Sequence, residues 1–107
     1  MALDTDLESI QEVRDAVRRA AEARVKLASF SQEQVDRIVA KMADAGRAHA
    51  RALAKMAVEE TGFGVYEDKV TKNLFASERV YEAIRDLRTV GVIRCDGSRK
   101  VAEIAEP

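Results

Sequence analysis

The sequence is short of the residues that usually carry chemistry or cross-links. Its 107 residues include one cysteine, one histidine, one proline and no tryptophan, and aromatic residues make up 5%. A single cysteine cannot form a disulfide within the chain, which suits a reducing compartment. One cysteine with one histidine also cannot assemble a zinc cluster. We therefore expect a cytoplasmic protein with no metal site of its own.

The chain also lacks a strong charge of either sign and a long apolar run. Its net charge is −1, and no stretch approaches the length of a membrane span. The first ten residues carry acids where a secretory signal needs basic residues. A basic run, interleaved with Asp15 and Glu22, is interpreted as a solvated helix face; it consists of Arg14, Arg18, Arg19, Arg24 and Lys26. We expect no membrane partner and no nucleic-acid partner.

Helical periodicity dominates the first eighty-odd residues. Apolar residues three or four apart predict a first helix with one apolar face. They are Leu3, Leu7, Ile10, Val13, Val17, Ala20, Ala21 and Val25. Asp15 with Arg19 and Glu22 with Lys26 are predicted to form ion pairs on its charged face.

A second helix is predicted to begin after Ser31. Ser31 and Gln34 can form a capping box, and Phe30 can pack on Val35 as a hydrophobic staple. The spacing predicts that this helix buries four residues, with Glu33 and Arg37 paired outside. The four are Val35, Ile38, Val39 and Met42.

Glycines punctuate the next stretch. Gly46 predicts a break or bend near residues 44–48, because glycine inside a helix costs about 1 kcal/mol relative to alanine. A third helix is expected to end at Thr61, where Gly62 or Gly64 supplies a positive φ. A further helix follows over residues 66–87, with an exposed pair between Asp68 and Lys72. Its apolar positions are Tyr66, Val70, Leu74, Val80, Tyr81, Ile84 and Leu87.

The pattern becomes β-prone after Arg88. Residues 89–95 and 100–104 read as strands, and Asp96-Gly97 between them is typical of a hairpin turn. Pro107 predicts that the second strand stops or leaves the pairing there. Two strands alone are marginal, so either the helices or missing chain must cover them. The predicted fold is mainly α with a C-terminal β-hairpin: one partial domain over residues 1–107, with a helical layer at 3–88 and a hairpin at 89–106.

Motifs that bind nucleotides are missing. Gly62-Phe63-Gly64 begins like a dinucleotide fingerprint, but Glu67 stands where the third glycine belongs and a helix precedes it, so a helix C-cap explains it better. Residues 91–97, GVIRCDG, bring two glycines together without the Gly-Lys-Ser/Thr end of a phosphate loop.

Side chains that could react are isolated. Cys95 could act as a nucleophile, but Arg94 beside it points to the other face of a strand, and we interpret Cys95 as a turn-flanking residue. His49 is interpreted as a solvated helix histidine rather than a base or a metal ligand. The acids at the glycine break end one helix and open the next, where acids favour the helix dipole; they are Glu59, Glu60, Glu67 and Asp68. No catalytic, cofactor-binding or metal residue is predicted.

Three ordered blocks nevertheless resemble the N-terminal region of CoA-acylating aldehyde dehydrogenases. The likeness is closest to the aldehyde half of bifunctional aldehyde-alcohol dehydrogenases, and it continues through residues 89–93 and 104–107. The blocks are residues 30–36 (FSQEQVD), 53–64 (LAKMAVEETGFG) and 67–78 (EDKVTKNLFASE).

The resemblance implies a parent enzyme that uses NAD and CoA to convert a short aldehyde to its acyl-CoA. It implies a homo-oligomer in which these helices and strands support the cofactor-binding domain of the aldehyde dehydrogenase fold. Cys95 does not match the family's nucleophile, which lies further along, and Leu74 stands where a histidine is common. We therefore expect a non-catalytic N-terminal fragment, truncated before the dinucleotide-binding sheet, that binds neither NAD nor CoA tightly.

Two other hypotheses belong to different classes. The chain could be a helical oligomerisation or assembly module that uses apolar helix faces or hairpin edges. It could also be a regulatory domain that binds nucleic acid through its arginine-rich first helix, although its near-neutral charge argues against this.

Overall fold

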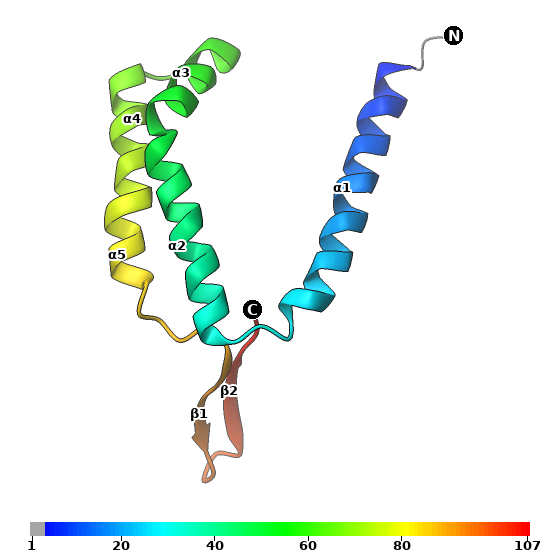
Figure 1. The fold of residues 1–107 in the computed structure, drawn as a ribbon, viewed down its shortest axis with the longest axis vertical. Helices are drawn as coiled ribbons and strands as arrows, with labels where there is room; N and C mark the ends of the chain where they lie inside the picture. The colour runs from blue at the N-terminus through cyan, green and yellow to red at the C-terminus, as the bar shows by residue number, and fades with distance from the viewer. Residues whose placement is uncertain (1–3) are drawn as a thin grey trace.

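The computed structural model describes residues 4–107, so Leu3 and its predicted place in the first helix lie outside the described residues. The predicted class is confirmed: the chain is mainly helical and ends in a β-hairpin (Figure 1). In chain order the elements are α1 (Thr5–Leu27), α2 (Gln32–Ala48), α3 (Ala50–Thr61), α4 (Tyr66–Leu74), the π-helix η1 (Phe75–Val80), α5 (Tyr81–Ile84), β1 (Gly91–Asp96) and β2 (Val101–Ala105).

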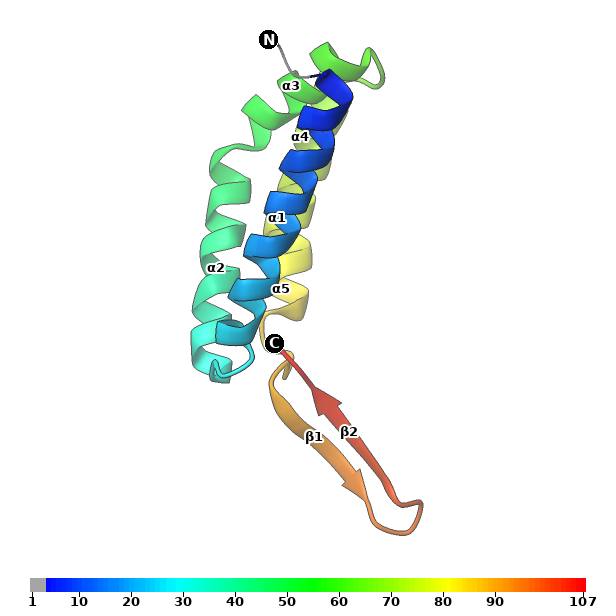
Figure 2. The same ribbon diagram turned by 90° about the vertical axis from the view of Figure 1, so that its right-hand side faces the viewer.

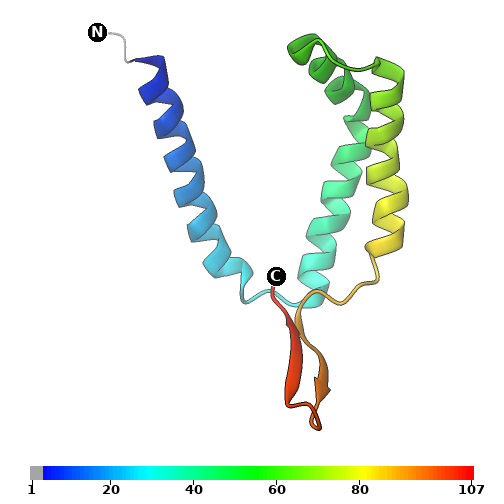
Figure 3. The ribbon, with the colours of Figure 1, turned by 180° about the vertical axis from the view of Figure 1, so that it is seen from behind.

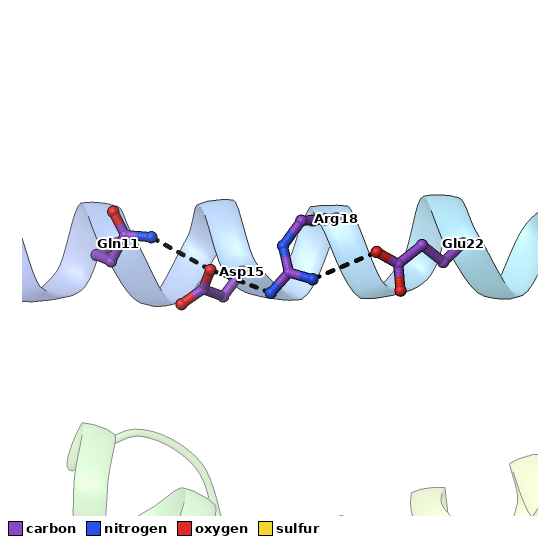
Figure 4. Close-up of polar contacts among 4 residues, drawn as sticks. All are labelled: Gln11, Asp15, Arg18 and Glu22. Carbon is purple, nitrogen blue, oxygen red and sulfur yellow. Dashed lines mark hydrogen bonds and ion pairs between the residues drawn. The ribbon is translucent and has the colours of Figure 1, made fainter.

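Helix α1 stands apart from the others (Figure 1, and from behind in Figure 3). Asp4 caps its N-terminus, with its carboxylate accepting from the Asp6 N–H. The predicted ion pairs on its surface are wrong in their partners. Arg18 lies between Asp15 at 3.5 Å and Glu22 at 3.3 Å and contacts both acids (Figure 4). One arginine thus reaches an acid three residues before it and another four residues after it, and within the described residues Arg19 and Lys26 form no ion pair.

Helix α2 begins as predicted and is buried less than predicted. The capping box is present: Gln34 N–H donates to Ser31 Oγ at 3.2 Å, and Ser31 N–H donates to Gln34 Oε1 at 2.8 Å. Arg37 and Glu33 pair at 2.8 Å, also as predicted. The expected burial of Ile38 and Met42 is wrong, since they are 40% and 66% exposed. Among the described residues α2 buries only its Ala43 side, because no element covers the other.

Gly46 does not break α2. The helix continues to Ala48, and the chain bends at His49, whose φ of −105° and ψ of 7° leave the helical region. A Cβ on Gly46 would lie 3.2 Å from the Cβ of Ser77, closer than ordinary van der Waals contact. Glycine is therefore present because η1 approaches the backbone of α2 here.

The glycine break after α3 has the predicted geometry, and the helix after it does not. Gly62 caps α3 with a left-handed φ of 68°. The expected single helix over residues 66–87 is instead α4, the π turn η1 and α5, and it ends at Ile84. Within the described residues Asp68 and Lys72 form no ion pair, although they were predicted to do so.

The hairpin has the predicted strands with a longer loop. β1 and β2 are antiparallel, with an irregularity in the register between Val92 and Arg94. Asp96 ends β1, and residues 97–100 form the loop instead of a two-residue turn. Asp96 Oδ1 holds this loop by accepting from Ser98 Oγ, Ser98 N–H and Arg99 N–H. β2 ends at Ala105, before Pro107, as predicted.

The assembled chain is extended and has almost no core. Its radius of gyration is 19.3 Å, whereas a compact chain of this length has about 13 Å. Its accessible surface is 9051 Å², against about 5,900 Å² for a compact protein of this mass. The buried apolar residues among those described are Ala43, Ala50 and Ala54. The hairpin projects beyond the helices, which do not cover it (Figure 2).

Candidate functional site

A small polar seam joins the helices. Asn73 Nδ2 donates to the Ala50 carbonyl at 3.0 Å, and Ser77 Oγ donates to the Asn73 carbonyl at 2.8 Å. Arg47 donates to the Ser77 carbonyl at 2.9 Å, pairs with Asp44, and lies 6.0 Å from the centre of the Tyr81 ring. These groups satisfy one another, so the seam positions α2 against the π turn and offers no unpaired group for a reaction.

The opposite side of α2 carries an open apolar groove. We call it the α2 groove; it is lined by Phe30, Gln34, Arg37, Ile38, Lys41, Met42 and Ala45. By helical periodicity these positions lie largely opposite Ala43 and Gly46, which face η1. Figure 1 shows α4 and α5 on one side of α2 and α1 on the other. The groove therefore faces the α1 side, with Arg37 and Lys41 as its two cationic side chains.

Two further apolar surfaces are uncovered. On α1, the stripe of Leu7, Ile10, Val13, Val17 and Val25 is exposed, with Val25 at 72%. On the hairpin, Val92, Ile93, Val101 and Ile104 are exposed as well. Side chains of this kind are normally buried, and contiguous exposed patches mark surfaces that contact something else.

The two candidate reactive side chains, Cys95 and His49, lie on different elements and contact no activating group among the described residues. Cys95 is a free, exposed thiol on β1, and the neighbouring Arg94 pairs with Glu103 at 3.5 Å. His49 is exposed at the bend between α2 and α3, where its Nδ1 lies 2.9 Å from the Ala45 carbonyl. Among residues 4–107, neither side chain contacts another candidate catalytic group.

The charged candidates and the glycine break are solvent-facing. Glu59, Glu60, Glu67 and Asp68 are all exposed, and Glu59 pairs with Lys55 at 3.7 Å. The basic run on α1 is exposed too. No group of acids, histidine or cysteine among residues 4–107 could hold a metal ion, and none of the described helices is long and apolar enough to cross a membrane. Gly62 follows a helix rather than a strand, so this break does not fit a dinucleotide.

One carboxylate is electrostatically distinct. The Ser98 hydroxyl and the Arg99 and Ser98 N–H groups donate to Asp96, and these hydrogen bonds hold the pKa of its carboxyl below its usual value. Asp96 is half-buried, and its hydrogen-bond partners belong to the hairpin loop. Its role is to hold that loop.

Known proteins match this chain closely over nearly all its length. No protein-family model matches it. The bifunctional aldehyde-alcohol dehydrogenase of Escherichia coli K12 is 46% identical over 99 residues, which is 92% of this chain and 11% of that protein. The acetylating succinate-semialdehyde dehydrogenase of Clostridium kluyveri is 39% identical over 95 residues, 89% of this chain and 21% of that one. The crystal structure of an acetylating aldehyde dehydrogenase from Geobacillus thermoglucosidasius superposes with a TM-score of 0.85 at 51% identity, covering 96% of this chain and 23% of that one.

The chain belongs to the acylating aldehyde dehydrogenase family. This confirms the family that the three sequence blocks indicated. The chain spans about a tenth to a quarter of the length of these acylating aldehyde dehydrogenases. The superposition covers 96% of this chain. The open shape of the chain is therefore shared with part of a solved acetylating aldehyde dehydrogenase whose own chain is several times longer.

Sequence reasoning missed the residues that hold the elements of this segment together. Asn73, Ser77 and Gln32 make their contacts with residues 23 to 58 positions away or across a π turn. No local motif marks such contacts. The one signal that could have found such a contact is Gly46, from which only a break or bend was predicted, although a glycine inside a helix can also have a packing reason.

Proposed function

We propose that this chain acts as part of a longer acylating aldehyde dehydrogenase, which oxidises a short-chain aldehyde such as acetaldehyde and transfers the acyl group to CoA, with NAD as the hydride acceptor. The similarity to relatives of this activity over nearly the whole chain is the observation that carries the proposal. The compartment we propose is the cytoplasm, where a lone exposed thiol such as Cys95 stays reduced.

The contribution we assign to this chain is packing, not chemistry. The α2 groove and the apolar stripe of α1 together supply the surface that the chain itself leaves uncovered. Its accessible area exceeds that of a compact protein by about 3,000 Å², which is more than the roughly 600–1,500 Å² of a typical contact between domains. We propose that the rest of the enzyme, including its cofactor-binding domain, covers these two faces.

The direct test is an activity assay on the 107-residue chain alone. With acetaldehyde, NAD and CoA present, we expect no NADH formation and no acyl-CoA, because Cys95 and His49 have no activating partner within residues 4–107. A full-length acetylating aldehyde dehydrogenase is the positive control. Turnover by the chain alone would overturn the proposal, and so would tight binding of NAD or CoA in calorimetry.

A second candidate is an assembly module without enzymatic activity. The observation that favours it is the hairpin, a two-stranded sheet whose outer edges are both unpaired and whose apolar side chains are exposed. Such a module would form a homo-oligomer at micromolar concentration. Sedimentation velocity showing only a monomer over that range would exclude it, whereas oligomers that persist after the strand edges are blocked would point to the helix faces instead.

A further inference from the structure

Gln32 connects two parts of the chain that are otherwise nearly independent. Its Oε1 accepts from the Thr89 N–H at 2.7 Å and from the Val90 N–H at 3.0 Å. Its Nε2 donates to Thr89 Oγ1 at 2.9 Å and to Asp36 Oδ1 at 2.8 Å. An amide side chain has two acceptor positions and two N–H donors, so Gln32 uses its whole capacity here.

These bonds have no substitute elsewhere in the described residues. Every hydrogen bond between residues 4–88 and residues 89–107 involves Gln32, and no ion pair joins the two parts. The connection between α5 and β1 carries no regular structure at residues 88 and 89, and Gly91 has a φ of 84°. Backbone of this kind does not by itself fix the direction in which the hairpin leaves the helices.

Gln32 is also not needed for the start of its own helix. Ser31 and Gln34 form the capping box at the N-terminus of α2. Asp36, one turn further along, holds the Gln32 amide so that its oxygen points to the segment before β1. The Gln32 side chain is therefore oriented by Asp36 of α2, and its other hydrogen bonds go to Thr89 and Val90 before the hairpin.

We propose that Gln32 is a latch that fixes the direction of the β-hairpin relative to the helical layer. With the latch closed, the hairpin keeps the orientation seen in Figure 2. Without it, the hairpin turns as a unit about residues 88–91 while both parts keep their own structure. This inference concerns the chain itself and holds whether or not the proposed enzymatic function is correct.

Hydrogen exchange at two amides tests the latch directly. In Gln32→Ala the Thr89 and Val90 N–H groups lose their acceptor, and we expect their exchange to become about five- to tenfold faster, the effect of losing one net hydrogen bond. The matched control is Gln34→Ala, which removes the other glutamine of the same helical turn and its capping bond. It should leave both amides unchanged. Equal acceleration in the two variants would show fraying of α2 and overturn the proposal.

The lone cysteine makes a distance measurement straightforward. Spin labels are placed on native Cys95 and on Lys41→Cys, an exposed position of α2, so that pulsed electron paramagnetic resonance reports the distance from hairpin to helix. Unlabelled chain is added in excess so that distances between labelled molecules do not contribute. We expect a narrow distribution with Gln32 and a broad one with Gln32→Ala, at unchanged helical circular dichroism. A broad distribution in the chain with Gln32, or a narrow one in Gln32→Ala, would overturn the proposal.

A paired substitution separates the latch from a general loss of stability. Gln32→Glu keeps the two acceptors but loses both donors and places a carboxylate against Asp36, so the distribution should broaden. Adding Asp36→Asn supplies an amide that can donate to the new carboxylate, and the narrow distribution should return. If the double variant is as broad as Gln32→Glu alone, the contact with Asp36 does not orient the latch.

Discussion

At the scale of single residues, the small and polar side chains that hold the helices together depend on distant partners. Gly46 looked like a helix breaker, which is its effect in an isolated helix. In the structure the missing side chain of Gly46 leaves room for Ser77, 31 residues further along the chain, and α2 continues through Gly46 unbroken. The capping box at Ser31 could be predicted because both of its members lie within one turn. The two cases differ in the separation of the interacting residues along the chain. Rules for local sequence cover Ser31 and Gln34 but contain no information about Ser77.

Enlarging Gly46 should separate α2 from η1. We expect Gly46→Leu to lower the free energy of unfolding by about 1–3 kcal/mol, the usual effect of overpacking, because even a Cβ would lie 3.2 Å from the Ser77 Cβ. Ala48→Leu, at the exposed end of the same helix, is the control and should change little. Urea unfolding followed by circular dichroism at helical wavelengths measures both. Equal stability of the two variants would contradict the close approach.

The hairpin loop should respond to acid through Asp96. Its pKa is lowered in the folded chain by hydrogen bonds from Ser98 and Arg99, so the stabilisation it gives is present above its unfolded pKa of about 4 and is lost as the pH falls through the folded value. We expect the Ser98 and Arg99 amide resonances to stay constant from neutral pH to about pH 4 and to shift below it. Asp96→Asn should abolish the transition; its persistence would assign it to another group.

At the scale of elements, ends and strands were more predictable than burial. Gly62 ends α3 with a positive φ, and Asp96-Gly97 marks the hairpin, because both depend on local backbone conformation. The predicted burial of Ile38 and Met42 was wrong. An apolar stripe indicates that a helix face packs against something, but it does not indicate whether the partner lies within the same chain. The π turn η1 was missed, and so was the approach of its Ser77 to Gly46 of α2, a tertiary contact that local patterns do not contain.

The end of α3 should tolerate only glycine well. Gly62 has a φ of 68°. We expect Gly62→Ala to lower the free energy of unfolding by about 1–2 kcal/mol, because a Cβ in the left-handed region clashes with the following carbonyl oxygen. Gly97→Ala is the matched control, because its φ is not positive and no atom lies within 4 Å of the new Cβ. Thermal unfolding of both variants measures the difference in stability between them. A neutral Gly62→Ala would mean that the helix ends elsewhere in solution.

Substitutions on the apolar face of α1 should leave the stability of the 107-residue chain nearly unchanged and should lower the stability of a longer enzyme. Val17 is 62% exposed, so Val17→Ser should change the stability of the 107-residue chain by less than about 0.5 kcal/mol. In a longer acylating aldehyde dehydrogenase that carries this segment, the same substitution should lower the melting temperature, because the apolar stripe would then be covered. Glu22→Gln, on the charged face of α1, is the control. The idea fails if Val17→Ser has the same effect in both proteins.

At the scale of the whole molecule, the chain is an extended framework with few buried residues. Apolar residues make up 47% of the chain, yet the buried apolar residues among those described are three alanines. Composition records how much apolar surface exists and not where the elements place it. The family, in contrast, could be identified from three ordered blocks of sequence, because identity over most of the chain does not depend on how it packs. The open shape and the family together support our proposal that the rest of a longer enzyme covers these faces.

The most direct measurement is a chimera. The matching segment of the Geobacillus thermoglucosidasius acetylating aldehyde dehydrogenase, 51% identical, would be replaced by this chain, and oxidation of acetaldehyde with NAD and CoA would be assayed. We predict a soluble, active chimera, and an inactive one when Met42→Asp places a charge in the α2 groove. An inactive or insoluble chimera with the unaltered segment would contradict the account, as would full activity with Met42→Asp.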